Sequence, residues 1–313
     1  MNSFSRRSLI AGATAAGLLA ALPGRALALP APPPAGPLDR RLFAPEEQRF
    51  APYLLAVSPM VADMTSGGFF AGGWWRSPAA TYNARVQEHV YTLAWFATQS
   101  RPWNPYRGNA ALLAALDAGL GHYLGLQHAD GSWPEYSRDQ HSLAATGFAM
   151  GYLSKTNALL RRAGVLPARQ AQLSAALKRA MTWFLNPAND TVWQPRLTWA
   201  NQTTSGLAGA ALALRHDPDP ALAHQLTAAF ARLAATGQSP AGFFYEESGA
   251  DTNYNFEVML PELADAWRQS GDANLVTMAR RYTDWLGYNL LREPDGSGWF
   301  ANVAPNSRTT SRF

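Results

Sequence analysis

The sequence predicts an all-α protein of the α/α-toroid class, an incomplete barrel of about four to five helical hairpins with short aromatic-bearing turns at one end. Two observations predict this class. Aromatic turns recur roughly every 50 to 60 residues, and two runs with helical spacing of apolar residues follow most of the turns. A solenoid of stacked helix pairs is the competing architecture. We favour the toroid because it would bring the turns together around one mouth.

Each turn delivers one or two large aromatic side chains. The marker residues of the five turns are Trp74, Trp133, Trp193, Phe243 and Trp299. Aromatic rings at regular intervals can fill the gaps between helix pairs, and rings at the mouth can stack on a ligand. Both roles are expected here.

Two helical runs follow each of the first four turns, and they differ in composition. The first runs are apolar or small on most sides, which suits an inner layer; they cover residues 82–96, 140–153, 203–214 and 256–267. The second runs carry charges at intervals, which suits an outer layer facing water; they cover residues 110–126, 168–184, 221–235 and 273–290. The repeating unit is therefore turn, inner helix, outer helix.

The N-terminus predicts export. Arg6 and Arg7 stand directly before an apolar run, and Ala26-Leu27-Ala28 supplies a small-residue cleavage site. This pattern is typical of a twin-arginine signal peptide over residues 1–28, so we expect a periplasmic or secreted protein. The apolar run is too short to cross a bilayer, so no stable membrane insertion is expected after cleavage. A Pro-rich spacer over residues 29–40 then leads into the toroid domain, residues 41–313.

Composition excludes several classes of function. The chain has 26 basic and 22 acidic residues. Removal of residues 1–28 leaves 23 against 22, which argues against the broad phosphate-binding surface of a nucleic-acid protein. The chain has no cysteine, and none of its six histidines are paired at i, i+4 spacing. We therefore expect neither a thiol nucleophile nor a zinc site, and no cofactor.

Polar residues open the inner helices and should meet at the mouth. They are Asn83, Arg85, Gln87, Arg138, Asp139, His141, Asn201, Gln202, Asp251, Asn253, Tyr254, Asn306 and Arg308. Helix capping explains one such residue per helix, but it does not call for His141, Gln202 or Tyr254. Nor does it call for nearby Tyr136, Tyr245, Glu246 and Glu247. Several helix N-termini at one mouth would favour an anionic guest, so the expected partner is an anionic polysaccharide or oligosaccharide.

Three segments resemble the helical domain of polysaccharide lyases, the heparinase II/III-like and chondroitin or alginate lyase group. They are Gln127–His141 with its Asp-Gly-Ser-Trp turn, Trp199–Gln202, and Phe244–Tyr254. The resemblance implies β-elimination at a uronate residue. In such lyases an Asn or Gln neutralises the uronate carboxylate, a Tyr or His removes the C5 proton, and a Tyr protonates the leaving oxygen.

Carried over to this sequence, the resemblance implies that Asn201 and Gln202 hold the carboxylate, that His141 is the base, and that Tyr254 or Tyr245 is the acid. The remaining candidates are substrate-binding residues. They are Trp133, Tyr136, Arg138, Asp139, Trp199, Phe244, Glu246, Asp251 and Arg308.

Three other functions fit the same pattern. A glycoside hydrolase or uronate epimerase on this scaffold could draw its carboxylates from Glu135, Asp139, Glu246, Glu247 and Asp251. A non-catalytic glycan-binding protein could use the aromatic rim alone. Residues 127–133 also fit Q-x-x-x-G-x-W, an aromatic-turn motif of isoprenoid cyclases, but the sequence has no clear acidic cluster of the kind those enzymes use.

Overall fold

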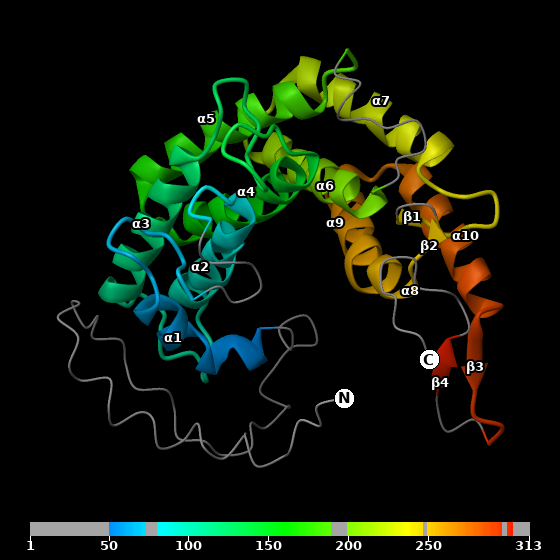
Figure 1. Cartoon of the computed structure of the whole chain (residues 1–313), viewed down its shortest axis with the longest axis horizontal. Coiled ribbons are helices and arrows are strands. Elements are labelled where there is room, and N and C mark those ends of the chain that lie inside the picture. The colour runs from blue at the N-terminus through cyan, green and yellow to red at the C-terminus, as the bar shows by residue number, and fades with distance from the viewer. Residues whose placement is uncertain (1–49, 73–79, 189–198, 247–248, 296–298, 303–313) are drawn as a thin grey trace.

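The structure of the chain is a computed structural model, and it describes residues 50–72, 80–188, 199–246, 249–295 and 299–302. The expected signal peptide, the spacer, Trp74, Trp193 and Arg308 lie outside these ranges. The described part is mostly helical, as the repeat predicts. Its helices form two layers along an open arc, and the described residues do not close it into a ring (Figure 1).

The inner layer consists of the helices on the concave side of the arc (Figure 1). Its members are α2 (Val90–Thr98), α4 (Leu143–Ala163), α6 (Ala200–His216) and α9 (Leu260–Ser270). Short helical turns precede two of them: the 3-10 helix η7 (Ala84–His89), and α8 (Thr252–Tyr254) with the π-helix η8 (Asn255–Met259). These inner helices fall where the sequence predicts them, but α4 continues ten residues past its expected end.

The outer layer consists of α3 (Ala110–Gly125), α5 (Pro167–Phe184), α7 (Pro220–Thr236) and α10 (Ala273–Gly287). Their starts match the predicted outer helices to within one residue. α10 ends three residues early because Leu290 begins a strand. Asn109, Asp219 and Asp272 cap three of these helices by accepting hydrogen bonds from first-turn N–H groups.

The remaining elements are short. The 3-10 helix η6 (Ala51–Leu55) and α1 (Val57–Ala62) precede the first inner helix. Strands β1 (Tyr245–Glu246) and β2 (Gly249–Ala250) form one antiparallel hairpin, and β3 (Leu290–Arg292) pairs antiparallel with β4 (Trp299–Asn302). The sequence pattern did not predict η6, α1 or either hairpin.

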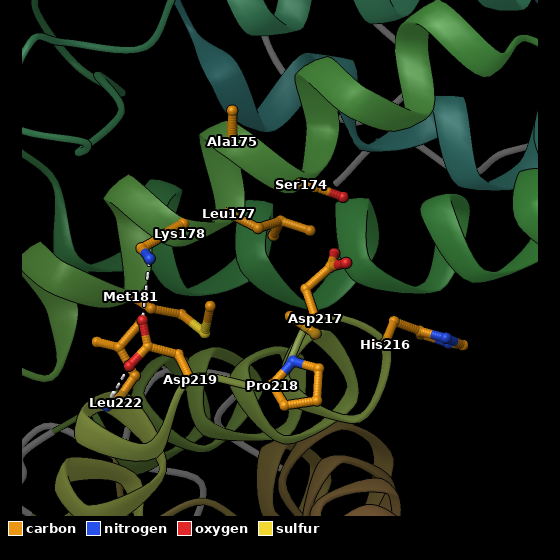
Figure 2. Close-up of a pocket in the computed structure, with 11 residues that line it drawn as sticks. Ser174, Ala175, Leu177, Lys178, Met181, His216, Asp217, Pro218, Asp219 and Leu222 are labelled. Carbon is orange, nitrogen blue, oxygen red and sulfur yellow. Dashed lines mark hydrogen bonds and ion pairs between the residues drawn. The ribbon is translucent and has the colours of Figure 1, made fainter.

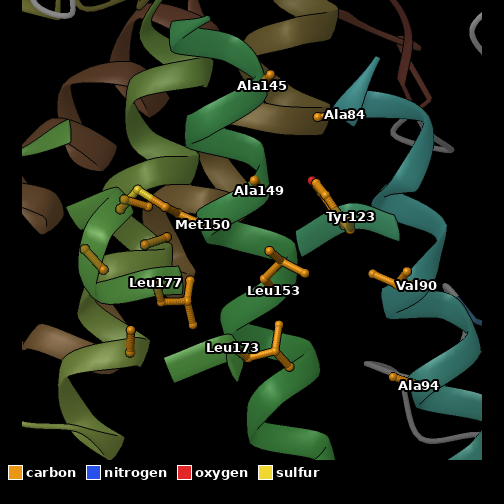
Figure 3. Packing of buried hydrophobic residues seen from close by; sticks show 14 of the residues in the cluster. Ala84, Val90, Ala94, Tyr123, Ala145, Ala149, Met150, Leu153, Leu173 and Leu177 are labelled. Atoms are coloured by element: carbon orange, nitrogen blue, oxygen red, sulfur yellow. The ribbon is translucent and has the colours of Figure 1, made fainter. Parts of the chain in front are cut away.

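Glycines let α4 and α6 approach closely. A Cβ on Gly147 would lie 2.3 Å from the carbonyl oxygen of Gln202, and one on Gly209 would lie 2.3 Å from the carbonyl carbon of Met150. Residue numbers rise together along this contact, so the two helices run in the same direction. Apolar side chains complete the packing. Figure 3 shows Leu153 of α4 among buried residues of the neighbouring helices, in the cluster that forms the core.

The next pair of inner helices has the same relative direction. Thr204 near the start of α6 donates to the sulfur of Met259, just before α9, at 3.0 Å. Arg215 at the end of α6 donates to Gln269 at the end of α9, at 3.1 Å. The two helices are therefore parallel.

The first pair is parallel as well. The guanidinium of Arg85 in η7 lies 3.9 Å from the ring centroid of Phe148, near the start of α4. One to two turns further along both helices, the rings of Tyr91 and Tyr152 are 6.0 Å apart. All four inner helices therefore start along the same edge of the arc, and the described turns lie along that edge as well.

Three turns in the described part of the chain share one backbone conformation. Each of the three contains a glycine with a positive φ, and a Cβ at that glycine would come within 2.1 to 2.4 Å of a carbonyl oxygen in an outer helix. Only glycine fits such a contact without moving backbone. The glycine and carbonyl pairs are Gly68 with Ala118, Gly131 with Arg179, and Gly242 with Arg281.

A glutamine braces two of these turns. Gln127 donates to the carbonyl of Gly131 and to a carbonyl of α5, both at 2.9 Å. Gln238 makes the same two bonds, to Gly242 at 2.6 Å and to a carbonyl of α10 at 2.8 Å. The Q-x-x-x-G pattern thus connects a turn to the outer layer by hydrogen bonds. This structural role accounts for the cyclase-like motif at residues 127–133 without a bound ligand.

Candidate functional site

Several predicted site residues meet at the start of α6. Trp199 pairs antiparallel with Glu246 of β1, and the side-chain amide of Asn201 donates a hydrogen bond to the Glu246 carboxylate. Asn201 is 1 % exposed and Glu246 is fully buried. Segments that are far apart in sequence therefore form one corner, which we call the α6 corner: residues 199–202, 245–246 and 251–254.

Asp251 and Tyr254 complete this corner. Asp251 is fully buried, and its carboxylate accepts the backbone N–H of Tyr254 at 3.1 Å, so it caps α8. Thr204 lies level with Met259 in the parallel pair α6 and α9. Tyr254, five residues before Met259, is therefore close to the level of Asn201. Tyr254 and Gln202 are half-buried.

Tyr245 is oriented differently from its neighbour Glu246. Successive side chains of a strand point to opposite faces, so Tyr245 points away from Asn201. Its ring packs edge-on against Phe243 at 5.5 Å, and Phe243 in turn contacts Trp285 of α10. Of the two tyrosines implied as the acid, Tyr254 is the one on the inner-helix side.

The turn before α4 carries His141 with its neighbours. Nδ1 of His141 lies 2.7 Å from both the Asp130 carboxylate and the Ser132 hydroxyl, and its ring lies 4.5 Å from that of His128. His141 itself is exposed. Asp130 also accepts from Ser132, and these bonds outweigh burial and hold the pKa of Asp130 below its ordinary value.

These contacts resemble a Ser-His-Asp triad in composition but not in geometry. A triad needs the carboxylate on one ring nitrogen and the hydroxyl on the other, whereas Asp130 and Ser132 both meet Nδ1. The relay is therefore not formed. Nε2 of His141 is directed away from both partners, which suits a base better than a relay.

Three further predicted contact residues lie in the loop that leads to His141. Tyr136 is 69 % exposed, Arg138 lies with its guanidinium 5.8 Å from the ring centroid of Tyr82, and Asp139 is exposed. The loop is held at its base, because Gln140 accepts the backbone N–H of Tyr136 at 2.7 Å. All three side chains are available to a ligand at the inner-helix starts.

Two predicted contact residues are core residues. Trp133 is fully buried and donates its indole N–H to the carbonyl of Tyr123 at 3.0 Å. Phe244 is fully buried and stacks on Tyr282 at 5.5 Å. This corrects the expectation that a sugar stacks on these two rings, because neither offers an open face. Trp199, which is half-buried, keeps that possibility.

Polar residues of the inner helices fix these aromatic positions. The backbone N–H of the aromatic residue is accepted by a side chain at the start of the following inner helix or in the short helical turn that precedes it, at 2.8 to 3.1 Å. The pairs are Phe70 with Gln87, Trp133 with Thr146, and Phe244 with Asn255. Gln87, which the sequence placed at the mouth, is thus a buried structural residue.

A buried charge cluster lies beside the turn before α4. Arg85 is paired with Glu88 and lies 3.8 Å from Glu135, which also accepts from the hydroxyl of Ser142 at 3.1 Å. Burial alone would lower the pKa of Arg85, but the two carboxylates outweigh it and raise the pKa. Glu88 was not recognised from the sequence. Its position three residues after Arg85 in a helical stretch was the available signal.

A second charge cluster crosses the concave layer. Lys155 of α4 reaches α9, where its ammonium lies 2.8 Å from Asp265 and 3.6 Å from Glu262. Burial opposes the charge, but the two carboxylates raise the pKa of Lys155 above its ordinary value. Sequence analysis did not identify this contact because Lys155 is more than a hundred positions from both carboxylates.

A pocket lies away from the α6 corner. It has a volume of about 420 Å³ and lies between α5, the end of α6 and the start of α7 (Figure 2). Leu177 and Met181 line it, and its charges are paired: Asp217 with Arg161 at 2.7 Å, and Asp219 with Lys178 at 3.0 Å. Both carboxylates are thus paired within the protein. We therefore interpret the pocket as the contact between neighbouring helix pairs and not as a ligand site.

Searches for similar proteins found no match among protein families, characterised proteins or solved structures. Within the described ranges, no cluster of three or more His, Asp or Glu side chains is arranged to bind a metal ion. The helices of those ranges also include none long and apolar enough to span a membrane.

Proposed function

We propose that the protein is an exported carbohydrate-active enzyme, a polysaccharide lyase that cleaves a uronate-containing glycan by β-elimination on an α/α-toroid scaffold. One observation carries the proposal: the parallel inner helices bring the α6 corner and the loop of His141 to the same edge of the arc, the edge where the inner helices start. Helix N-termini at that end favour a carboxylated guest.

The roles follow from accessibility. Gln202 is the amide that can reach a uronate carboxylate, while Asn201 is occupied by Glu246 and positions the start of α6. His141 accepts the C5 proton, the electron pair forms the C4–C5 double bond, and the C4–O bond breaks. Tyr254 protonates the leaving oxygen. Trp199, Tyr136 and Arg138 line the approach of the glycan.

The state of the carboxylates favours elimination over hydrolysis. Hydrolysis needs two carboxyl groups that reach the glycosidic bond from either side. Glu135, Glu246 and Asp251 are at most 2 % exposed, and each is engaged by protein groups. Of the described candidates only Asp139 is exposed, so they offer no second accessible carboxylate to flank the bond. Elimination instead uses a tyrosine, a histidine and an amide.

The test is a screen of the full chain, with its signal removed, against uronate polymers. Elimination creates a C4–C5 double bond, so we expect new ultraviolet absorbance with at least one polymer. New reducing ends without that absorbance would identify a hydrolase instead. Binding without either signal would identify a glycan-binding protein.

Two variants test the assigned roles. We expect Tyr254→Phe to lower the rate of elimination by about a hundredfold or more while binding stays within a small factor, because only the transferable proton is lost. The matched control is Tyr288→Phe, since Tyr288 is 89 % exposed beyond α10.

His141→Ala should have the same effect as Tyr254→Phe, with His224→Ala on the exposed side of α7 as its control. Full activity in both Tyr254→Phe and His141→Ala would show that the site lies elsewhere.

A further inference from the structure

Two of the aromatic turns share one frame but differ in three side chains. Residues 127–133 and 238–244 each place a bracing glutamine first and a glycine with a positive φ fifth. At the second, fourth and sixth positions the later turn has serine, alanine and phenylalanine, whereas the earlier turn has His128, Asp130 and Ser132. The frame therefore forms without these three polar side chains, and their presence in one turn needs another explanation.

The hydrogen bonds around Asp130 determine where the protons lie. Burial of its carboxyl is outweighed by the bonds from Ser132, which hold the pKa of Asp130 below its ordinary value, so at neutral pH the carboxylate is ionised and can only accept. One oxygen accepts from the backbone N–H of Ser132 at 3.0 Å and from its hydroxyl at 2.8 Å. The other oxygen lies 2.7 Å from Nδ1 of His141. Two lone pairs at that distance would repel each other, so Nδ1 carries a proton and donates it to Asp130.

A proton on Nδ1 leaves Nε2 of the neutral His141 ring with a lone pair. The hydroxyl of Ser132 also lies 2.7 Å from Nδ1, but its only proton is donated to Asp130, so towards the ring its oxygen acts as an acceptor. Among the residues that the structure describes, none hydrogen-bonds to Nε2, and the side chain of His141 is 49 % exposed. The basic nitrogen of His141 is therefore not used by the described part of the chain.

His128 has the opposite arrangement of protons. Its ring centroid lies 4.5 Å from that of His141, and its Nε2 lies 3.2 Å from the carbonyl oxygen of Gln140. A carbonyl oxygen can only accept, so Nε2 of His128 carries the proton. The two adjacent rings thus hold their protons on different nitrogens, because their hydrogen-bond partners differ.

We propose that Asp130 is a positioning residue for His141, which it holds in the Nδ1–H tautomer so that Nε2 is the nitrogen that accepts a proton. The chemistry of this inference rests on the proposed function, in which that proton comes from C5 of the uronate. When Nε2 takes the proton, the ring becomes a cation, and the neighbouring carboxylate of Asp130 stabilises it while keeping its own charge. The tautomer itself does not depend on any substrate.

The test is nitrogen-15 NMR of the full chain with labelled histidines, because ring nitrogens that carry a proton and those that carry a lone pair resonate far apart. Spectra are recorded at about pH 9, well above the ordinary histidine pKa of about 6.5, so that neutral rings dominate. The signals are assigned by their loss in His141→Gln and His128→Gln. We expect the proton on Nδ1 in His141 and on Nε2 in His128.

Two variants separate the roles of the turn residues. Asp130→Ala introduces the residue type that the later turn already has at this position, so the turn should still fold. His141 should then divide between both tautomers, while His128 keeps its proton on Nε2. Ser132→Ala should leave both tautomers unchanged, because the hydroxyl donates to Asp130 and not to the ring. The control is Asp284→Ala, which removes an exposed carboxylate of α10.

Circular dichroism of every variant checks that the helices remain folded. A proton on Nε2 of His141 in the wild-type protein would overturn the proposal, and so would an unchanged tautomer in Asp130→Ala. With a polymer that the wild-type protein cleaves, Asp130→Ala should lower kcat by about tenfold or more and leave KM within a small factor. The spectra need no substrate, so a chain that shows the expected tautomers but cleaves no polymer would contradict the proposed function alone.

Discussion

Replacement of Gly209 by alanine should loosen the inner layer. An added Cβ would lie 2.3 Å from the carbonyl carbon of Met150, 2.4 Å from its oxygen and 2.6 Å from the nitrogen of Gly151. All three are backbone atoms, so no side chain can rotate away. Ordinary contact begins near 3.4 Å, and α4 and α6 must therefore move apart by roughly 1 Å.

Two opposing effects determine the size of the change. Alanine is favoured over glycine within a helix by about 1 kcal/mol. Overpacking of a core costs about 1 to 3 kcal/mol, and a gap of roughly 1 Å forfeits up to half of the dispersion energy between the separated atoms. Because the clash is with backbone along a long helix contact, we expect the cost to win. The free energy of unfolding should fall by about 1 to 3 kcal/mol.

The assay is urea denaturation followed by circular dichroism, with Gly287→Ala as the matched control. Gly287 is also helical, but a Cβ there has no heavy atom within 4 Å. This control should be unchanged or more stable by up to about 1 kcal/mol. If Gly209→Ala matched or exceeded the wild-type protein in stability, the close parallel packing of α4 and α6 would be refuted.

Two further predictions concern stability. Gln238→Ala should lower the free energy of unfolding by about 2 kcal/mol, because two buried carbonyls lose their donor; exposed Gln172→Ala is the control, and equal effects of the two would contradict the bracing role. Burial lowers the pKa of His89 to about 4. As the pH falls, this histidine is therefore protonated in the unfolded chain before it is protonated in the folded protein. Stability should therefore decrease as pH drops from about 6.5 towards 4, by up to about 3 kcal/mol. Denaturation curves of wild-type protein and His89→Gln across this range check it, and parallel pH profiles would refute it.

The helices could be predicted from the sequence because each unit repeats the same period. The outer helices begin within one residue of their expected positions, since capping residues such as Asp219 mark their starts. The end of α4 was missed because its last turns are polar. Asn157 and Arg161 point to Ser174 of α5, and Gly164 then ends the helix with a positive φ of 66°.

The site could be predicted only as a region. The parallel inner helices place its polar residues at one end, as the repeat implies. The sequence does not show which side chains are used internally, since that depends on contacts between units. Asn201 is occupied by Glu246, and the ring of Trp133 is enclosed by the core. Both facts follow from three-dimensional packing and not from local pattern.

The most direct measurement of the central claim is a set of four distances between spin labels. The chain has no cysteine, so label pairs can be introduced at exposed positions without background. Asp139 marks the start of α4 and Arg162 its end, while Asn253 precedes α9 and Ser270 ends it. The helical rise between Asn253 and Ser270 is about 25 Å.

With all inner helices starting at one end, the start-to-start pair, Asp139 with Asn253, and the end-to-end pair, Arg162 with Ser270, should be the short distances. The two crossed pairs should be longer by on the order of 10 Å. Crossed pairs that are equal to the matched pairs, or shorter, would mean that the inner helices do not gather their starts at a common end.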